Sequence, residues 1–272
     1  MISQELLEKY EKLKSYIASL NKVVVAYSSG VDSTFLLYAS SKALGSNAIA
    51  VTASSYLFPK RELTQALEYC NSLGIKHVIT YPKELMIDGF SANPANRCYI
   101  CKYDLFSKIL DIANSEGTNH VLEGSNLDDE GDYRPGLKAI DELHILSPLR
   151  ITGFTKNEIR ELSSHFGLPT WDKPSFACLA SRFPYGEEIS EEKLRMVEEA
   201  EQYLYDLGFK QFRVRIHGTL ARIELDPIDF PRILDDTLRT GVYTTLKNIG
   251  FSYISLDLKG YRTGSMNETL NQ

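Results

Sequence analysis

The sequence is poor in cysteine, glycine and proline, and it has no long apolar run. Its 272 residues include four Cys, 17 Gly and 10 Pro. So few cysteines exclude the disulfide framework of a small secreted protein, and the Gly and Pro contents exclude collagen-like and proline-rich chains. No apolar run approaches the roughly 18 residues of a membrane span. The Glu- and Lys-rich segment 1–20 predicts an amphipathic helix rather than a signal peptide, so we expect a cytoplasmic protein with no membrane partner.

An excess of basic residues is also missing. The chain has 30 Lys and Arg against 36 Asp and Glu, a formal net charge of −6. Proteins that bind long nucleic acids need a basic footprint, so nucleic acid is not the expected partner. Hydrophobic residues make up 43% of the chain, enough for one large domain or for a large and a small one.

The first part of the chain alternates between short β-branched runs and helical patterns. This alternation predicts βαβ units and therefore an α/β fold with a doubly wound parallel sheet. Two cysteines near residue 100 fall in a less regular stretch. Strands are predicted at 23–27, 47–52, 76–80 and 120–123, and helices at 1–20, 33–43, 60–72 and 103–114.

The rhythm changes between residues 169 and 186, where three Pro occur. We place a boundary there, which divides the chain into domains 1–186 and 187–272. The second domain is predicted to be a smaller α+β unit for substrate binding or oligomerisation. Its pattern gives a helix at 190–207 capped by Ser190, a hairpin of 212–216 and 221–225, a mostly helical stretch at 228–249 and a strand at 253–258.

The segment Ser28–Ser33, SSGVDS, joins a predicted buried strand to a helix. Small residues let backbone N–H groups approach an anion, and the helix N-terminus adds the positive end of its dipole. No Gly-Lys-Ser/Thr ending follows, so this is not a Walker A loop. A strand–helix turn without a ligand is the alternative interpretation.

This segment resembles the SGGxDS signature of the PP-loop ATP pyrophosphatases, with Ser29 where the first Gly is usual. That family cleaves ATP between the α- and β-phosphates and forms an adenylate. Asp32 becomes a candidate Mg²⁺ contact, the alternative being a cap on the helix dipole. The resemblance implies ATP binding by Ser28, Ser29, Gly30, Val31, Asp32, Ser33, Thr52, Gly124, Asn126 and Asp128.

A second segment, 123–129 or EGSNLDD, resembles the GTNxDD element of the same enzymes. It follows a predicted strand, and open α/β sheets bind ligands outside the carboxyl ends of their strands. An Asx-type turn with solvated carboxylates is the alternative.

The whole chain further resembles the LarE family of ATP-dependent sulfur transferases, which act in nickel-pincer cofactor assembly. The resemblance implies adenylation of pyridinium-3,5-biscarboxylic acid mononucleotide and replacement of the activated oxygen by sulfur, in two rounds. It also implies a homo-oligomer. The segments that carry it are 131–136 (GDYRPG), 147–149 (SPL), 178–186 (CLASRFPYG), 213–218 (RVRIHG) and 260–267 (GYRTGSMN).

The predicted hairpin fits such a substrate. Alternation places Arg213, Arg215 and His217 on one face, and Arg guanidinium groups pair bidentately with phosphate and carboxylate. A solvated outer face with Glu partners is the alternative. The candidate substrate-binding residues are Arg134, Ser181, Arg182, Arg213, Arg215, His217, Arg222 and Glu224.

The cysteines indicate where the sulfur comes from. Cys98 and Cys101 form a Cys-x-x-Cys, Cys178 lies near the boundary, and Cys70 falls in a helical pattern typical of a core residue. Thiolates favour zinc or iron–sulfur clusters, and a 4Fe-4S cluster usually takes four of them. With three, one iron remains open for a sulfide. The three-Cys pattern therefore predicts catalytic roles for Cys98, Cys101 and Cys178 as ligands of a 4Fe-4S cluster.

Alternatives remain at this point. They are a sacrificial Cys178 that loses its sulfur and becomes dehydroalanine, a zinc site, and a Cys98–Cys101 disulfide. PP-loop tRNA thiolases also use three cluster-binding cysteines, but they need a basic RNA surface, and this chain lacks zinc-ribbon Cys pairs and a basic tail. A nucleotide-sensing module does not explain the cysteines and arginines. The expected ligands are ATP, Mg²⁺, the small mononucleotide, and sulfide or another sulfur donor.

Overall fold

The structure is a computed structural model that describes residues 2–129, 135–174, 177–262 and 264–266. Contacts within the chain divide these residues into two compact units. The first draws on residues 1–83 and 96–176, and the second on residues 84–95 and those from 177 onward. The boundary after residue 186 stays a prediction. Within the described ranges, no helix has both the length and the apolarity that crossing a membrane requires.

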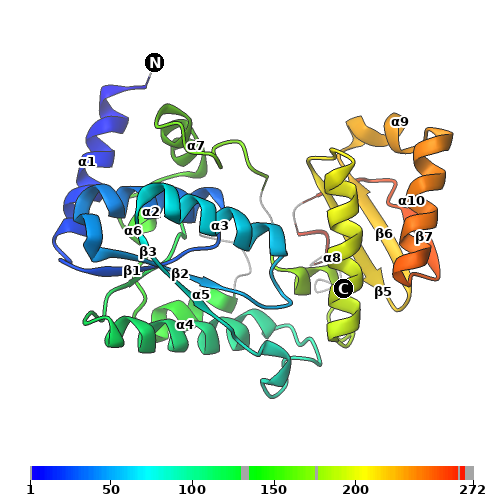
Figure 1. The fold of residues 1–272 in the computed structure, drawn as a ribbon, viewed down its shortest axis with the longest axis horizontal. Helices are drawn as coiled ribbons and strands as arrows, with labels where there is room; N and C mark the ends of the chain where they lie inside the picture. The colour runs from blue at the N-terminus through cyan, green and yellow to red at the C-terminus, as the bar shows by residue number, and fades with distance from the viewer. Residues whose placement is uncertain (1, 130–134, 175–176, 263, 267–272) are drawn as a thin grey trace. The chain divides into compact units, whose positions relative to one another are not determined.

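The first unit is built on a parallel sheet in the order β3-β2-β1-β4, and Figure 1 labels β1, β2 and β3 in this sheet. The chain moves outward from β1 to β3 and then returns to the other side of β1, so the strand order reverses between β1 and β4. Open α/β sheets bind ligands at this switch point. The predicted α/β class is confirmed. The strands are β1 (Val23–Ala26), β2 (Ala48–Ala53), β3 (Lys76–Thr80) and β4 (Val121–Leu122).

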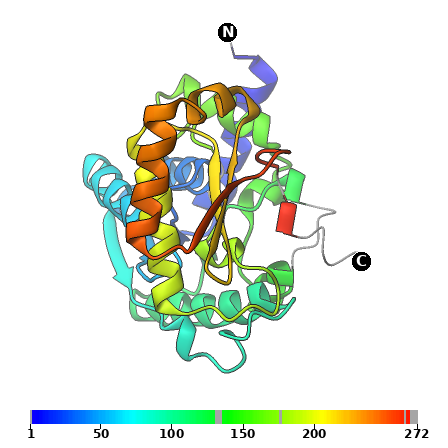
Figure 2. The same ribbon diagram turned by 90° about the vertical axis from the view of Figure 1, so that its right-hand side faces the viewer.

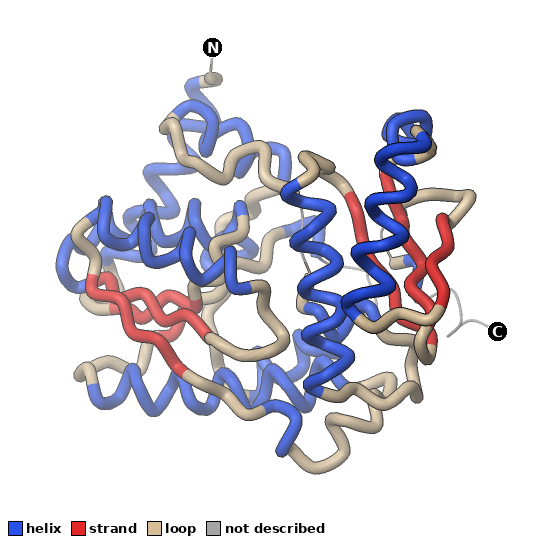
Figure 3. Tube along the Cα trace, turned by 45° about the vertical axis from the view of Figure 1, so that its right-hand side comes forward, coloured by secondary structure: helices blue, strands red, loops and turns tan. Residues whose placement is uncertain are grey.

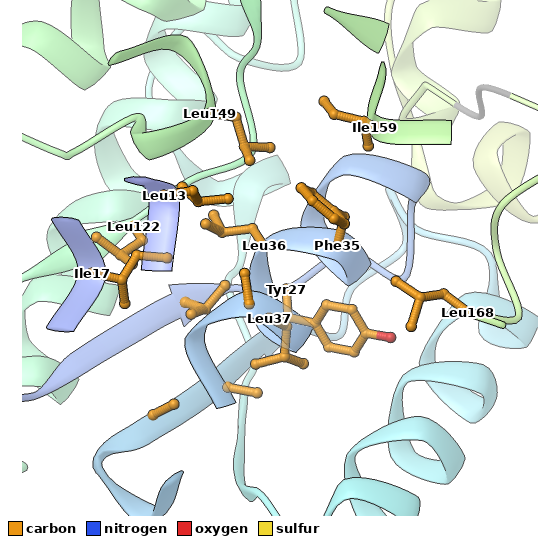
Figure 4. Packing of buried hydrophobic residues seen from close by; sticks show 14 of the residues in the cluster. Leu13, Ile17, Tyr27, Phe35, Leu36, Leu37, Leu122, Leu149, Ile159 and Leu168 are labelled. Carbon is orange, nitrogen blue, oxygen red and sulfur yellow. The ribbon is translucent and has the colours of Figure 1, made fainter. Parts of the chain in front are cut away.

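Helices cover both faces of this sheet (Figure 1). Alternate residues of β1 serve two cores, since Val23 and Val25 belong to one cluster and Val24 to the other. Figure 4 shows the first cluster, to which α2 contributes Phe35 and Leu36. One layer holds α1 (Gln4–Ala18), α2 (Val31–Leu44), α3 (Lys60–Leu73), α6 (Pro148–Ile151) and α7 (Lys156–His165), and the other holds α4 (Arg97–Ser115) and α5 (Pro135–Glu142).

The main departure from the predicted elements is α4. The pattern predicts a helix only from residue 103 and leaves both cysteines outside it, whereas α4 begins at Arg97. Packing against α5 explains the longer helix, because a Cβ on Gly136 would lie 2.7 Å from the Lys102 side chain. The expectation of an irregular stretch at Cys98 and Cys101 is therefore wrong, and both lie in the first turns of α4.

The second unit contains the predicted hairpin, β5 (Phe212–His217) with β6 (Leu220–Leu225), and β7 (Tyr253–Leu256) runs parallel to β6. Helices α8 (Glu191–Asp206) and α10 (Asp236–Ile249) run side by side along this sheet (Figures 2 and 3). Ser190 caps α8 as predicted. The predicted 228–249 helix is interrupted, because Asp235 caps α10 separately from the short α9 (Phe230–Ile233).

Candidate functional site

The turn that follows β1 has the geometry of an anion site. Gly30 is the N-cap of α2, and the N–H of Thr34 donates to its carbonyl at 2.9 Å. The N–H groups of residues 31–33 have no acceptor within the helix. The Ser33 hydroxyl braces the turn, 3.1 Å from the Ser28 hydroxyl and 3.3 Å from the Gly30 carbonyl. The turn thus offers backbone donors at the positive end of a helix.

Ser29 holds the strained backbone of this turn. Its φ of 58° lies in the left-handed region, whereas Gly30 has a φ of −81°. A left-handed conformation costs a residue with a Cβ roughly 1–2 kcal/mol. PP-loop enzymes usually have a glycine at this position, and its left-handed backbone explains why glycine is favoured there. This chain has a buried serine instead.

Thr52, at the carboxyl end of β2, joins neighbouring strands. Its hydroxyl donates to the carbonyl of Tyr27 at 2.8 Å and lies 2.8 Å from Nε2 of His77 on β3. Since the only hydroxyl proton of Thr52 is used, His77 must donate through Nε2. Burial lowers the pKa of His77, which favours this neutral form.

The loop after β4 reaches the start of α2. A Cβ on Gly124 would lie 3.1 Å from the backbone nitrogen of Ser33, so glycine permits the close approach. The Asn126 side chain donates to Asp32 at 3.3 Å, and its carbonyl oxygen accepts from the N–H of Asp128 at 3.0 Å. The structure therefore brings Gly124, Asn126 and Asp128 to the turn.

Two lysines of this site were not found from the sequence. The ammonium group of Lys156, at the start of α7, pairs with Asp32, and its backbone N–H donates to Asp128 at 2.8 Å. Lys173 donates to the carbonyl of Ser29 at 2.9 Å. The Thr155–Glu158 capping box is the local signal for the start of α7. Both oxygens of Asp32 have protein donors, and its contact with Mg²⁺ stays a prediction.

In the second unit, the predicted arginine face of β5 and β6 is buried rather than solvated. Arg213 and Arg215 are 3% and 5% exposed. Arg215 binds the buried carboxylate of Glu224 at 2.9 Å and the carbonyl of Ser181 at 2.9 Å. Arg222 pairs with Glu224 and with Asp257, each at 3.1 Å. Glu224 thus orders two arginines of the face.

Arg182 anchors the turn that carries Cys178. It is fully buried and makes two contacts of 2.8 Å with the equally buried Glu201 of α8. Its remaining nitrogen donates to the carbonyls of Ala177 at 2.8 Å and Cys178 at 3.2 Å, and to the hydroxyl of Ser181 at 2.7 Å. Arg182 therefore fixes the backbone at Cys178.

Five arginines of the second unit form one cluster. Arg213 lies over the ring of Tyr261, 5.0 Å from its centroid. Burial and the neighbouring charge of Arg182 lower the pKa of Arg213 to about 10. Among the described residues, five guanidinium groups of this cluster face three carboxylates. The members are Arg182, Arg213, Arg215, Arg222, Arg262, Glu201, Glu224 and Asp257.

Two further residues predicted to bind the substrate are His217 and Arg134. His217 is half-buried, and burial together with the charge of Arg222 lowers its pKa. Its Nε2 has no hydrogen-bond partner among the described residues. Arg134 lies outside the described residues.

The structure holds all four cysteines as thiols. Cys70 is a fully buried core residue, as predicted, and burial raises the pKa of its thiol to about 12. Cys98 and Cys101 are half-buried on one side of α4 in the first unit, because residues three apart are neighbours on a helix. Cys178 is half-buried in the second unit, at the N-cap of the 3-10 turn Leu179–Arg182. Among the described residues, no group of three His, Cys, Asp or Glu forms a metal site.

Comparison with known proteins gives the class first. No protein-family model matches the chain. A region covering 56% of it is 25% identical to a component of the glutamine-hydrolysing GMP synthase of Thermoplasma volcanium, over 54% of that protein. With the parallel sheet and the SSGVDS turn at its switch point, this defines a PP-loop enzyme.

Two relatives match along nearly the whole chain. One, from Lactiplantibacillus plantarum, is a pyridinium-3,5-bisthiocarboxylic acid mononucleotide synthase, 37% identical over 98% of this chain and 96% of its own. The other, an uncharacterized protein of Synechocystis sp., is 42% identical over 97% and 98%. The chain belongs to the LarE family of pyridinium-3,5-bisthiocarboxylic acid mononucleotide synthases, and it is an ATP-dependent sulfur transferase.

Proposed function

We propose that this enzyme uses ATP to adenylate the carboxylates of pyridinium-3,5-biscarboxylic acid mononucleotide and then replaces the activated oxygen by sulfur. The supporting observation is a backbone anion site at the sheet's switch point, in a chain that is 37% identical to the synthase over 98% of its length. Two rounds convert both carboxylates to thiocarboxylates.

The first half-reaction belongs to the first unit. A carboxylate oxygen of the substrate attacks the α-phosphorus of ATP, the bond to the bridging oxygen breaks, and pyrophosphate leaves. The N–H groups of residues 31–33 and the ammonium group of Lys156 bind phosphate oxygens, because they are donors fixed at one helix end. Asp32, to which Asn126 donates, orients Lys156 and would contact Mg²⁺ bound to the phosphates. Thr52, near the carboxyl end of β2, completes the nucleotide site.

The arginine cluster binds the phosphate and the carboxylates of the mononucleotide. Support comes from the burial of several guanidinium groups together and from the lowered pKa of Arg213, because an anion would stabilise the cationic side chains. Arg213, Arg215 and Arg222 are the direct ligands in this proposal, with Arg134, Ser181 and His217 as further contacts. Arg182 and Glu224 act chiefly by holding the turn at Cys178 and the other arginines.

For the sulfur, we propose a 4Fe-4S cluster held by Cys98, Cys101 and Cys178. The donor set fits, since all three are thiols with half-buried side chains and two of them share one side of a helix. Such a cluster would supply an iron that binds the sulfide. Sulfide then attacks the acyl carbon of the adenylate, the carbon–oxygen bond to AMP breaks, and AMP leaves. A sacrificial Cys178 is the competing mechanism, and a homo-oligomer is the expected assembly.

The test incubates anaerobically purified enzyme with MgATP, sulfide and the biscarboxylic acid mononucleotide. Mass spectrometry should find the mono- and bisthiocarboxylic products, with one AMP and one pyrophosphate for each oxygen replaced. Asp32→Ala should lose both adenylation and transfer while the far-UV circular dichroism spectrum stays that of the wild type. Formation of ADP and phosphate in place of AMP and pyrophosphate would refute the proposal.

A further inference from the structure

Lys173 lies beside the SSGVDS turn and donates hydrogen bonds with all of its ammonium protons, and the proposed reaction assigns it no role. Its ammonium group donates to Ser29 at 2.9 Å, Glu62 at 2.5 Å and Gln65 at 2.6 Å. An ammonium group has three protons, so all of them are used. The side chain is only 13% exposed. This lysine is therefore bound to the protein at every donor.

The backbone of Lys173 is fixed as well. Arg160 of α7 donates to the carbonyls of Trp171 at 2.7 Å and Lys173 at 2.8 Å. Glu62 and Gln65 belong to α3, so α3 holds the ammonium group beside the Ser29 carbonyl while Arg160 of α7 holds the backbone of Lys173. With its backbone and its ammonium group both bound, Lys173 approaches the Ser29 carbonyl from one fixed direction.

The carbonyl that receives Lys173 belongs to the strained residue. Ser29 has a φ of 58°, and because it has a Cβ, this left-handed conformation is energetically unfavourable for it. The same peptide plane carries the Ser29 carbonyl and the Gly30 N–H, which point in opposite directions in a trans peptide. Fixing the carbonyl therefore fixes the direction of the Gly30 N–H.

We propose that Lys173 is a positioning residue that holds Ser29 in its left-handed conformation and so aims the Gly30 N–H at a phosphate of ATP. The inference rests on the proposed ATP site. It explains how this chain keeps a serine at the position where other PP-loop enzymes use glycine. The hydrogen bond from Lys173 stabilises a left-handed conformation that glycine, which lacks a Cβ, adopts without strain.

The test is a double-mutant cycle on binding of an ATP analogue with a non-cleavable α,β-methylene bridge, measured by calorimetry. Lys173→Met should weaken binding about tenfold or more, as expected for a lost charge-assisted hydrogen bond. In the Ser29→Gly background the same change should cost no more than about threefold, because glycine adopts the left-handed conformation unaided. Equal losses in the two backgrounds, or no loss in either, would overturn the proposal.

Two controls keep the result clear. Lys76→Met removes a lysine paired with Glu116 at the opposite end of β3, and it should leave binding unchanged. Because Lys173→Met leaves Glu62 without this cation, the cycle is repeated with Glu62→Gln, where no carboxylate is stranded.

Hydrogen–deuterium exchange supplies a readout without nucleotide. Lys173→Met should speed exchange in residues 28–34 of the wild-type background. The same change in the Ser29→Gly background should not. Unchanged exchange in the single variant would contradict the proposal. Sulfur transfer is not measured in this series. A protein that binds ATP but forms ADP refutes the proposed function and leaves this inference standing, whereas equal losses in the two backgrounds refute the inference alone.

Discussion

Arg182 and Glu201 are each fully buried, and each can carry its charge there because the other is present. Burial raises the pKa of a carboxyl group, but the guanidinium charge and its hydrogen bonds outweigh this and lower the pKa of Glu201. The same guanidinium holds the carbonyls of Ala177 and Cys178. One ion pair thus joins α8 to the turn at Cys178 and holds the backbone there.

We predict that Arg182→Met lowers the free energy of unfolding by about 3–5 kcal/mol, because it strands a buried carboxylate. Denaturant unfolding measures this. Arg182→Met combined with Glu201→Met should recover much of the loss, since no charge is then buried alone. Both variants should alter the rate at which Cys178 reacts with a thiol reagent. A double variant as unstable as the single one would show that packing, not charge, dominates.

His77 gives a prediction for pH. Burial lowers its pKa below the ordinary value of 6.5, so the folded protein resists protonation more than the unfolded chain does. As pH falls below 6.5, the unfolded state takes up a proton first and the free energy of unfolding decreases; above 6.5 this contribution is constant. His77→Gln keeps a donor for Thr52 and should lose less stability between about pH 7 and pH 5. His217, whose pKa is also lowered, is present in both proteins and cancels. Parallel stability curves would contradict the assignment.

At the scale of elements, β5 carries two functions on its two faces. Phe212, Val214 and Ile216 are fully buried, and Arg213 and Arg215 alternate with them. Because successive side chains of a strand point to opposite faces, the apolar residues serve the core while the arginines line the proposed substrate site. Substitutions at the arginines therefore need not disturb the apolar face.

We predict that Arg213→Ala or Arg215→Ala weakens binding of the mononucleotide roughly ten- to a hundredfold, the cost of a lost charge-assisted hydrogen bond. ATP binding should change far less, because the phosphate-binding turn lies in the first unit. Calorimetry with each ligand separately decides this. Arg195→Ala, which removes an exposed arginine of α8 paired with Glu199, is the matched control. Equal losses for both ligands would rule out a separate substrate site.

The elements also show what the sequence can and cannot predict. The SSGVDS turn is predictable because strand, small residues and helix are contiguous. The lysines at the site are not, because Lys156 reaches Asp32 across 124 residues and Lys173 reaches Ser29 across 144. Alternation on β5 predicts which arginines share a face, but it does not predict that Arg215 binds Ser181 and Ser265 from other segments.

At the scale of the whole molecule, the three proposed cluster ligands come from both units. Cys98 and Cys101 lie on α4 of the first, and Cys178 follows the segment that enters the second. If the proposed cluster takes all three thiolates, its loss would affect more than sulfur chemistry, because residues of both units would lose a shared ligand. Metal binding of this kind also contributes to stability, since the ligand set is complete only in the folded chain.

The two sulfur mechanisms make opposite predictions for single cysteine variants. With a catalytic cluster, Cys98→Ala, Cys101→Ala and Cys178→Ala each lose the visible absorbance of the cluster and the transfer activity, because three thiolates are the minimum that holds it with one iron open. Wild-type enzyme supplied with sulfide then turns over repeatedly and keeps its full mass. With a sacrificial cysteine, Cys98→Ala stays active, only Cys178→Ala is inactive, and one turnover removes H₂S from residue 178. Cys70→Ala is the control in both cases, because this thiol is buried in the core. Dehydroalanine at residue 178 in active, cluster-loaded protein would overturn the cluster mechanism while leaving the adenylation chemistry intact.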